Sequence, residues 1–281
     1  MNFNHQTGFA DLNGARVYYE MAGAGHPLVL LHAGICDSRM WDAQVDAFAQ
    51  HYQVVRYDLR GFGQTASVDG SFAHHHDLLA LLNHLGIEKT YLLGCSMGGS
   101  AALDFALEQP ERVAALILVG SSPSGYKANR PPPTQLDAVD AAVNAGDFER
   151  ASELEVQIWV DGPSRTPDQV PSSIRDRVRV MNTIALQNEV LDLGQVEPLD
   201  PPAVQRLEEF QSPTLVVVGD LDQPRILDSA EFLVTHLPAV REAVIPGTAH
   251  LPNMEQPERF NELVLNFLAN RCDYSDPVYY N

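Results

Sequence analysis

The sequence is poor in cysteine and contains no long apolar run. Its three cysteines, Cys36, Cys95 and Cys272, form no Cys-x-x-Cys pair, which argues against a disulfide framework and against a structural zinc site. No stretch reaches the roughly 18 consecutive apolar residues of a membrane-spanning helix. The first residues show no basic segment followed by an apolar one, so no secretory signal is expected. These absences favour a protein of the reducing cytoplasm.

Basic side chains are also scarce, since 18 lysines and arginines stand against 37 aspartates and glutamates, a formal net charge of −19. Such an excess of negative charge repels nucleic acids and anionic membrane surfaces, so neither is expected as a partner. Apolar residues are plentiful. At 45% of the 281 residues, they suffice for one large domain with an insertion or for two small domains.

Predicted strands and helices alternate along most of the chain. Asn13-Gly14 favours a hairpin turn between two antiparallel strands. Continuous apolar runs such as 27–32 are typical of strands buried on both faces of a parallel sheet, and segments with helical spacing separate them. We therefore expect an α/β fold with a mostly parallel, twisted sheet and helices on both faces. The predicted strands cover 9–12, 16–21, 27–32, 53–58, 91–94, 113–119, 213–219 and 240–245, and the predicted helices 39–50, 77–85, 100–109, 226–237 and 256–269.

The alternation stops in a segment that begins and ends with proline clusters. Within it lie two helical patterns, at 147–159 and 172–189, and the segment is too apolar for a disordered linker. We expect residues 122–211 to form a helical cap over the ligand-binding end of the sheet, with residues 1–121 and 212–281 as the core. Trp159, Met181 and Ile184 of this cap are the candidate pocket residues.

The motif Gly94-Cys95-Ser96-Met97-Gly98 lies between a predicted strand and a predicted helix. In a Gly-x-Ser-x-Gly turn of this kind, the serine hydroxyl stands clear of the sheet, and the flanking glycines allow the chain to approach itself closely. The Met97 amide and the helix N-terminus then point toward an anion that forms beside Ser96. Ser96 is therefore the candidate nucleophile. Cys95 is a rival on chemical grounds, but the glycines are symmetric about Ser96.

A serine nucleophile needs a base, and His236 and His250 follow Ser96 in the chain. His236 lies inside a predicted helix, whereas His250 lies in a loop directly after a strand, where a base can reach the nucleophile. The base needs a carboxylate to orient it, and Asp220 and Asp222 both follow another strand. Spacing alone leaves both aspartates open.

With these motifs, the chain resembles the α/β-hydrolase superfamily, and within it the esterase, 3-oxoadipate enol-lactonase and perhydrolase-like branch. The resemblance runs from about Phe9 to Ala269. It rests on GCSMGG together with LLHAG, YDLRGFGQT, VVVGDLDQP and GTAHLPNMEQPERF. It implies the α/β-hydrolase fold, with Asp222 as the acid and His250 as the base of a catalytic triad.

The resemblance also implies an oxyanion hole made of two backbone amides. One belongs to Met97, and the other follows a His-Gly pair that reads His32-Ala33 in this chain. We expect the Gly34 amide to be the second donor, with Ile35 or Cys36 as alternatives.

The expected function is hydrolysis of a small carboxylic ester through an acyl-enzyme on Ser96, without a cofactor or a metal. The same triad would serve an enol-lactonase, a carbon–carbon bond hydrolase or a cofactor-free perhydrolase. A non-enzymatic receptor of the same fold would bind a ligand in the pocket without turnover. The expected partner is thus a small-molecule ester or lactone.

Two further features bear on ligands. An anionic substrate would need a cation in its pocket, and four of the arginines in the cap are candidates, although a solvated helix face is the more usual place for such side chains. The three successive histidines at 74–76 point about 100° apart on a helix, so they do not suggest a metal site. The arginines are Arg165, Arg175, Arg177 and Arg179.

The C-terminal residues 273–281 (DYSDPVYYN) are rich in aromatic side chains and have no evident place in the fold. Two placements stay open for them, on the body of the protein or on a partner chain. A homo-oligomer is therefore one of the expected possibilities.

Overall fold

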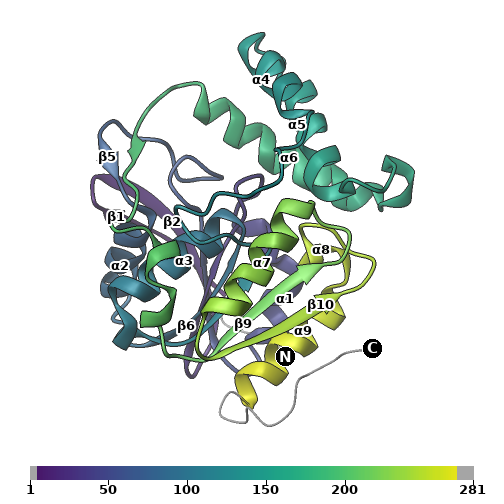
Figure 1. Ribbon diagram of the computed structural model, residues 1–281. Helices are drawn as coiled ribbons and strands as arrows, with labels where there is room; N and C mark the ends of the chain where they lie inside the picture. Colours follow the sequence, from purple (N-terminus) through teal and green to yellow (C-terminus); the bar gives the residue numbers. More distant parts are fainter. Residues whose placement is uncertain (1–4, 271–281) are drawn as a thin grey trace.

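Eight strands form one sheet in the computed structural model, which describes residues 5–270 (Figure 1). The tail at 273–281, for which two placements were expected, lies outside the described residues. The strand order is β1-β2-β4-β3-β6-β7-β9-β10, where β2 pairs antiparallel with β1 and β4, and all other neighbours run parallel. The predicted mostly parallel sheet is confirmed. The strands are β1 (Gln6–Leu12), β2 (Ala15–Gly23), β3 (Pro27–Leu31), β4 (Gln53–Tyr57), β6 (Thr90–Cys95), β7 (Val113–Val119), β9 (Thr214–Gly219) and β10 (Val240–Ile245).

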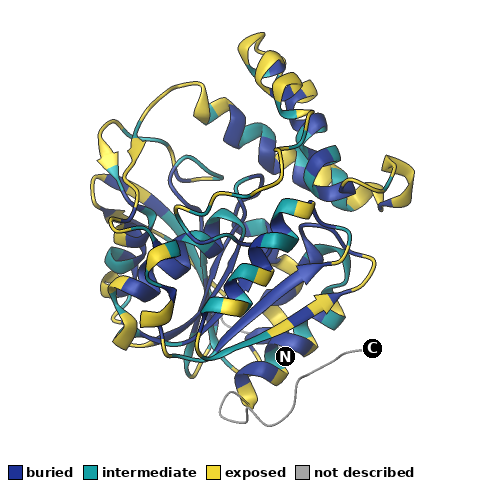
Figure 2. Ribbon diagram, viewed as in Figure 1, coloured by how far each residue is buried: buried dark blue, intermediate teal, exposed yellow. Residues whose placement is uncertain are grey.

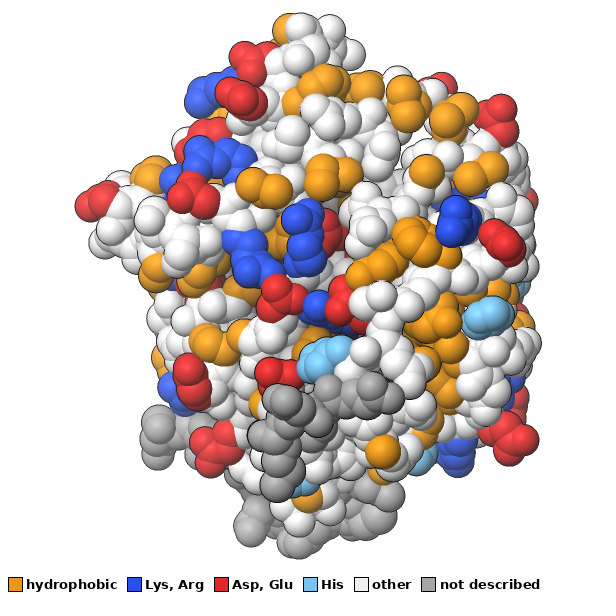
Figure 3. Space-filling model, turned by 180° about the vertical axis from the view of Figure 1, so that it is seen from behind, with side chains coloured by type: hydrophobic (Ala, Val, Ile, Leu, Met, Phe, Trp, Pro, Cys, Tyr) orange, Lys and Arg blue, Asp and Glu red, His pale blue; other side chains and the backbone are white. Residues whose placement is uncertain are grey.

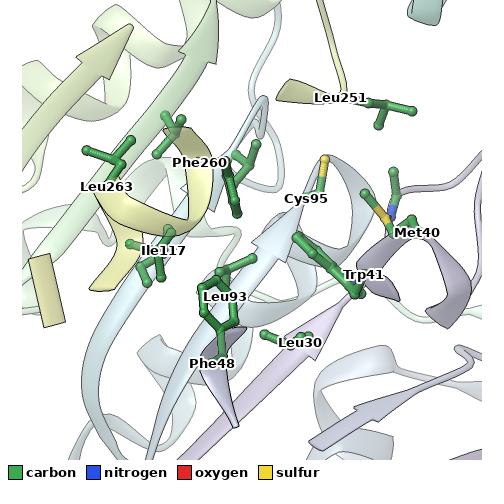
Figure 4. Close-up of a cluster of buried hydrophobic side chains, with 14 of the residues drawn as sticks. Leu30, Met40, Trp41, Phe48, Leu93, Cys95, Ile117, Leu251, Phe260 and Leu263 are labelled. Carbon is green, nitrogen blue, oxygen red and sulfur yellow. The ribbon is translucent and has the colours of Figure 1, made fainter. Parts of the chain in front are cut away.

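Helices cover both faces of this sheet, because its central strands are apolar on both sides. Along β3, Leu28 and Leu30 belong to one buried cluster and Val29 and Leu31 to the other, as the two-residue period of a strand requires. Figure 4 shows the first cluster, with the rings of Trp41, Phe48 and Phe260 around the side chains of the strands. On this face lie α1 (Asp42–Phe48), α8 (Pro252–Glu255) and α9 (Pro257–Ala269), and on the other α2 (His74–His84), α3 (Met97–Glu108) and α7 (Pro224–His236).

The segment between β7 and β9 adds three helices above one end of the sheet (Figure 1). Helix α6 (Ser172–Glu189) coincides with the predicted one, and α5 (Phe148–Val156) continues into a π-helical turn, η3 (Gln157–Asp161). Helix α4 (Leu136–Asn144) was missed, because it follows directly on the prolines at 131–133, which indicated a loop. The three helices and η3 share a small apolar cluster made of Val139, Ala142, Ala151, Leu154, Ile158 and Leu186.

Contacts with the sheet-bearing part hold this segment in place. Strands β5 (Ser71–Phe72) and β8 (Gln195–Val196) form a second, two-stranded sheet, and the Asn188 side-chain amide donates to the Gly61 carbonyl at 2.9 Å. Arg177 pairs with Asp42. Figure 2 shows exposed residues on the outer side of α4 and buried ones where α6 meets the rest of the chain. The predicted boundaries near 121 and 212 fall in the loops after β7 and before β9, and the division into core and cap stays a prediction.

Arg60 ties its own loop to helix α2 and to the turn between β1 and β2. Its guanidinium donates to both carboxylate oxygens of Asp77, at 2.9 and 2.8 Å, and to the Asn13 carbonyl at 3.2 Å. The Phe72 ring lies 4.6 Å from the guanidinium carbon. The pair is buried, so its charges neutralise each other away from solvent.

None of the helices in the described part of the chain combines the length and the apolarity that crossing a bilayer requires.

Candidate active site

Ser96 occupies the single residue between the end of β6 and the start of α3. Its backbone has φ 51° and ψ −117°, a conformation that residues with a side chain rarely adopt. The Ser96 amide donates to the Val119 carbonyl at 2.8 Å, and the Ser96 carbonyl accepts the Ser100 amide at 2.9 Å. The turn is therefore held from the neighbouring strand and from the helix, so its strained conformation is maintained by its surroundings.

The glycines around Ser96 explain why this turn needs its sequence. A Cβ atom on Gly98 would lie 2.6 Å from the Leu31 carbonyl carbon and closer still to the His32 oxygen. A Cβ atom on Gly94 would lie 2.6 Å from the Gly98 carbonyl carbon. Backbone atoms surround both positions and cannot give way as a flexible side chain does, so only glycine fits there.

Gly98→Ala is therefore expected to destabilise the protein by about 1–3 kcal/mol or more, the usual cost of overpacking, because a strand end has to shift. Gly34→Ala is the matched control, because a Cβ atom there would meet the Met97 side chain at an ordinary 3.7 Å. Urea unfolding would measure both free energies. Equal stability of Gly98→Ala and the parent protein would show that the close approach at Gly98 is not required.

His250 and Asp222 form a buried pair at the same edge of the sheet. His250 Nδ1 lies 2.8 Å from Asp222 Oδ2, and the two side chains are only 3% and 1% exposed. An ionised carboxylate only accepts hydrogen bonds, so this contact places the proton on Nδ1 and leaves Nε2 free to act as a base. Asp222 Oδ1 accepts the Gln223 amide at 2.6 Å, which fixes the carboxylate.

The other two residues that the sequence offered for these roles lie elsewhere. Asp220 is exposed and accepts the Gly247 amide at 2.6 Å through Oδ1. His236 lies in α7, where its Nδ1 is 2.8 Å from the Phe232 carbonyl oxygen. Of the two candidate aspartates, Asp222 is the one that contacts His250.

The end of β7 joins the serine turn to this pair. Val119 accepts the Ser96 amide, and a Cβ atom on the next residue, Gly120, would lie 3.0 Å from His250 Nδ1 and 3.3 Å from Asp222 Oδ2. Cys95 Sγ lies 3.8 Å from the His250 carbonyl oxygen. The loops after β6, β9 and β10 thus converge at the carboxyl edge of the parallel strands, where ligands bind in open α/β sheets.

The loop after β3 brings Gly34 close to Met97. A Cβ atom added to Gly34 would lie 3.7 Å from both the Cβ and the Sδ atoms of Met97. Burial lowers the pKa of His32, which accepts the Leu59 amide on Nε2 at 2.9 Å and lies 2.8 Å from the Ala33 oxygen through Nδ1. The Cys36 amide donates to the Ala33 carbonyl at 3.0 Å. Because this amide already has an acceptor, Cys36 is not available as the second donor of the oxyanion hole. Gly34 and Ile35 remain the candidates.

A cavity of about 330 Å³ begins at Gly34 and Met97 and extends to residues 122–211, the predicted cap, which is called the cap segment below. On the cap side, residues of α5 and α6 line it, including Glu155 and Asn182, which sequence reasoning missed. The full lining is Gly34, Arg60, Gly61, Phe62, Ser67, Phe72, Met97, Glu155, Asn182, Ala185, Leu186, Asn188, Glu189, Asp192, Leu193 and Gly194.

The three pocket residues expected from the sequence have different surroundings. The Trp159 ring lies 4.8 Å from the His250 ring, and its carbonyl accepts the His250 amide at 3.3 Å. Met181 is 1% exposed and packs in the apolar cluster that continues from the sheet. Ile184 is half-buried on α6. Their neighbours Asn182, Ala185 and Leu186 line the cavity instead.

The four arginines considered as candidate cations all pair with carboxylates, and none of the four lines this cavity. Arg165 and Arg175 are only 11% exposed, so they do not form a solvated helix face. On the face drawn in Figure 3, basic side chains lie beside acidic ones in the same manner. The pairs are Arg165 with Glu255, Arg175 with Glu153 and Asp161, Arg177 with Asp42, and Arg179 with Glu153 and Asp176.

Among residues 5–270, no group of three or more histidine, cysteine, aspartate or glutamate side chains is arranged so that it could hold a metal ion. The histidines at 74–76 form the first turn of α2.

Comparison with known proteins identifies the family. Residues 28–263 match the model of the alpha/beta hydrolase family. The chain is 32% identical over 268 residues to the 2-hydroxy-6-oxononadienedioate/2-hydroxy-6-oxononatrienedioate hydrolase of Paraburkholderia phymatum, covering 90% of this chain and 91% of the relative. It is 31% identical over 259 residues to the pimeloyl-[acyl-carrier protein] methyl ester esterase of Aeromonas salmonicida, covering 90% and 99%.

Solved structures agree with this result. An esterase from Thermogutta terrifontis superposes with a TM-score of 0.75 at 26% identity, over 94% of this chain and 98% of that one. A bromoperoxidase from Bacillus anthracis gives 0.78 at 25% identity, over 94% and 100%. The fold and the enzyme class expected from the sequence are confirmed, and the chain belongs to the alpha/beta hydrolase family of hydrolytic enzymes.

Proposed function

We propose that the protein is a serine esterase that hydrolyses small carboxylic esters through an acyl-enzyme on Ser96. The observation that carries the proposal is the buried His250–Asp222 pair, which meets the strained Ser96 turn at the end of β7. A nucleophile, a base and an orienting carboxylate from three separate loops make up the constellation that acyl transfer needs.

In the first half of the reaction, Ser96 Oγ attacks the ester carbonyl carbon while His250 Nε2 takes the hydroxyl proton. The carbonyl oxygen becomes an oxyanion, which accepts hydrogen bonds from the amides of Met97 and Gly34. The Met97 amide belongs to the N-terminus of α3, where unpaired amides and the helix dipole favour negative charge. His250 then protonates the departing alcohol, and the acyl group stays on Ser96.

In the second half, water repeats the attack on the acyl-enzyme. His250 takes a proton from the water and returns it to Ser96 Oγ as the carboxylic acid leaves. Asp222 remains ionised and stabilises the imidazolium that forms in each half. The contact between the His250 amide and the Trp159 carbonyl holds the loop of the base against the cap segment.

An ester substrate suits this cavity better than a dicarboxylate does. The relative from Paraburkholderia phymatum is named for a dienedioate, which has two carboxylates. Here the cavity is lined by three acidic side chains, and its one basic side chain, Arg60, is already bound to Asp77. The Aeromonas salmonicida relative, named as a methyl ester esterase, offers the closer chemical analogy.

Active-site labelling with a fluorophosphonate tests this proposal directly. We expect the probe to attach to Ser96, as found by mass spectrometry of the labelled peptide, together with turnover of p-nitrophenyl acetate and butyrate. A panel with small lactones and with peracid formation from acetate and hydrogen peroxide then separates esterase from lactonase and perhydrolase. Absence of labelling at Ser96 would favour a ligand receptor and overturn the proposed function.

A further inference from the structure

Glu155 and Asn182 form a hydrogen-bonded pair that lines one end of the cavity, on the side of the cap segment. Gly34 and Met97 line the opposite end. Glu155 comes from α5 and Asn182 from α6, and Asn182 Nδ2 donates to Glu155 Oε2 at 2.6 Å. The pair therefore faces the space that a substrate bound at Ser96 would extend into.

Asn182 holds the carboxylate in place. It is only 1% exposed, and its Nδ2 also lies 3.4 Å from Ser152 Oγ, which in turn donates to the Arg179 carbonyl at 3.2 Å. The side-chain amide is thus fixed between α5 and α6. Among residues 5–270, no group donates to the second oxygen of Glu155, Oε1, which is left to accept a hydrogen bond from a ligand.

The remaining charges of the cavity reinforce its acidity. Its acidic lining residues are Glu155, Glu189 and Asp192, and its basic residue is Arg60, whose guanidinium makes two hydrogen bonds to Asp77. Burial raises the pKa of Glu155, the hydrogen bond from Asn182 opposes this rise, and the charge of Glu189 adds to it. A second carboxylate brought in by a ligand would meet repulsion without a compensating cation.

We propose that Glu155 selects the substrate class: it accepts a hydrogen bond from a hydroxyl or ammonium group remote from the scissile ester and excludes esters that carry a carboxylate there. This inference rests on the proposed esterase function. Glu155 acts here as a specificity residue, because it touches the distal end of the substrate and takes no part in the proton transfers at Ser96.

Two matched sets of esters test the inference, one for each orientation of the ester in the site. The first set contains the p-nitrophenyl esters of hexanoate, 6-hydroxyhexanoate, 6-aminohexanoate and adipate. The second contains the acetate esters of hexanol, 1,6-hexanediol, 6-aminohexanol and 6-hydroxyhexanoate. In at least one set, we expect kcat/KM for the hydroxyl and ammonium esters to exceed that for the carboxylate ester by about ten- to hundredfold, the range of a hydrogen bond to a charged group.

Glu155→Gln should change this selectivity. It keeps an acceptor oxygen but removes the charge, so we expect the ammonium-to-carboxylate ratio of kcat/KM to fall by about tenfold or more, mostly through KM. Glu149→Gln is the matched control, because Glu149 lies on the same helix, is exposed and does not line the cavity. It removes the same charge and should leave the ratio unchanged.

The outcomes separate this inference from the function on which it rests. Failure to hydrolyse the unsubstituted hexanoate and acetate esters would overturn the esterase proposal. In that case, calorimetry would measure the affinities of the same esters for Ser96→Ala. The order of these affinities tests the preference of Glu155 without turnover. Two results would overturn the inference and leave the esterase proposal intact. One is a kcat/KM for the carboxylate esters that matches or exceeds that for the other esters in both sets. The other is an identical ammonium-to-carboxylate ratio in Glu155→Gln and Glu149→Gln.

Discussion

Ser96→Ala is expected to lower kcat for p-nitrophenyl butyrate by about 10⁴-fold or more, because removal of the nucleophile leaves only the oxyanion amides and substrate binding. The fold should survive, since alanine keeps the backbone hydrogen bonds of the turn to Val119 and Ser100. Steady-state kinetics would measure the loss of kcat, and the midpoint of unfolding would show whether the fold is retained. Activity retained within tenfold of the parent would show that Ser96 is not the nucleophile.

Cys95→Ala is the informative companion variant, because the thiol next to Ser96 is the chemical rival. Cys95 is completely buried, and burial raises the pKa of its thiol, which suppresses the reactive thiolate. Its side chain belongs to the apolar cluster of Figure 4, and Cys95 is not among the residues that line the cavity at Met97. We expect this variant to keep fluorophosphonate labelling at Ser96. If Cys95→Ala lost the labelling and Ser96→Ala kept it, Cys95 and not Ser96 would be the nucleophile.

The strands and the serine turn could be predicted from the sequence because local chemistry determines them. The apolar run at 27–32 allows only a strand buried on both faces, and the structure places β3 at Pro27–Leu31. Gly94 and Gly98 were expected from the close approach of the chain, and backbone atoms do lie where their Cβ atoms would be. In both cases, a few adjacent residues contain all the information.

The cavity lining could not be predicted in the same way, because it depends on how a helix is rotated against several neighbours. The bounds of α6 were predicted correctly, yet Met181 packs into the sheet cluster while Asn182 faces α5 and the cavity. Asn182 offered one usable signal. A polar side chain beside the apolar positions Met181 and Ala185 has to find a polar partner when it is buried.

Ion pairs between distant parts of the chain could not be predicted from the sequence either. Arg165 was considered as a possible cation for an anionic substrate, but it binds Glu255, ninety residues further along, and the carbonyls of Val160 and Asp161. Glu255 also accepts the Ala249 amide at 2.7 Å, directly before His250. The cation therefore ties the π-helical turn to the loop of the base, a role that only the folded chain reveals.

Asp222→Asn is expected to lower kcat by about 10³–10⁴-fold while the protein stays folded, because the amide oxygen still accepts the Gln223 amide. The asparagine NH₂ group donates to Nδ1 of His250, which moves the ring proton to Nε2 and removes the base from the side facing Ser96. The stabilising charge next to the imidazolium is lost as well. Initial rates with p-nitrophenyl butyrate at neutral pH measure the combined effect.

Asp220→Asn decides between the two aspartates that the sequence left open. Asp220 is exposed and accepts the Gly247 amide, a contact that an asparagine oxygen preserves, so we expect less than about a tenfold change in kcat. The two variants lie two residues apart and remove the same charge, so any long-range electrostatic effect is common to both. A large loss in Asp220→Asn with near-parent activity in Asp222→Asn would assign the orienting carboxylate to Asp220, against the 2.8 Å contact between His250 and Asp222.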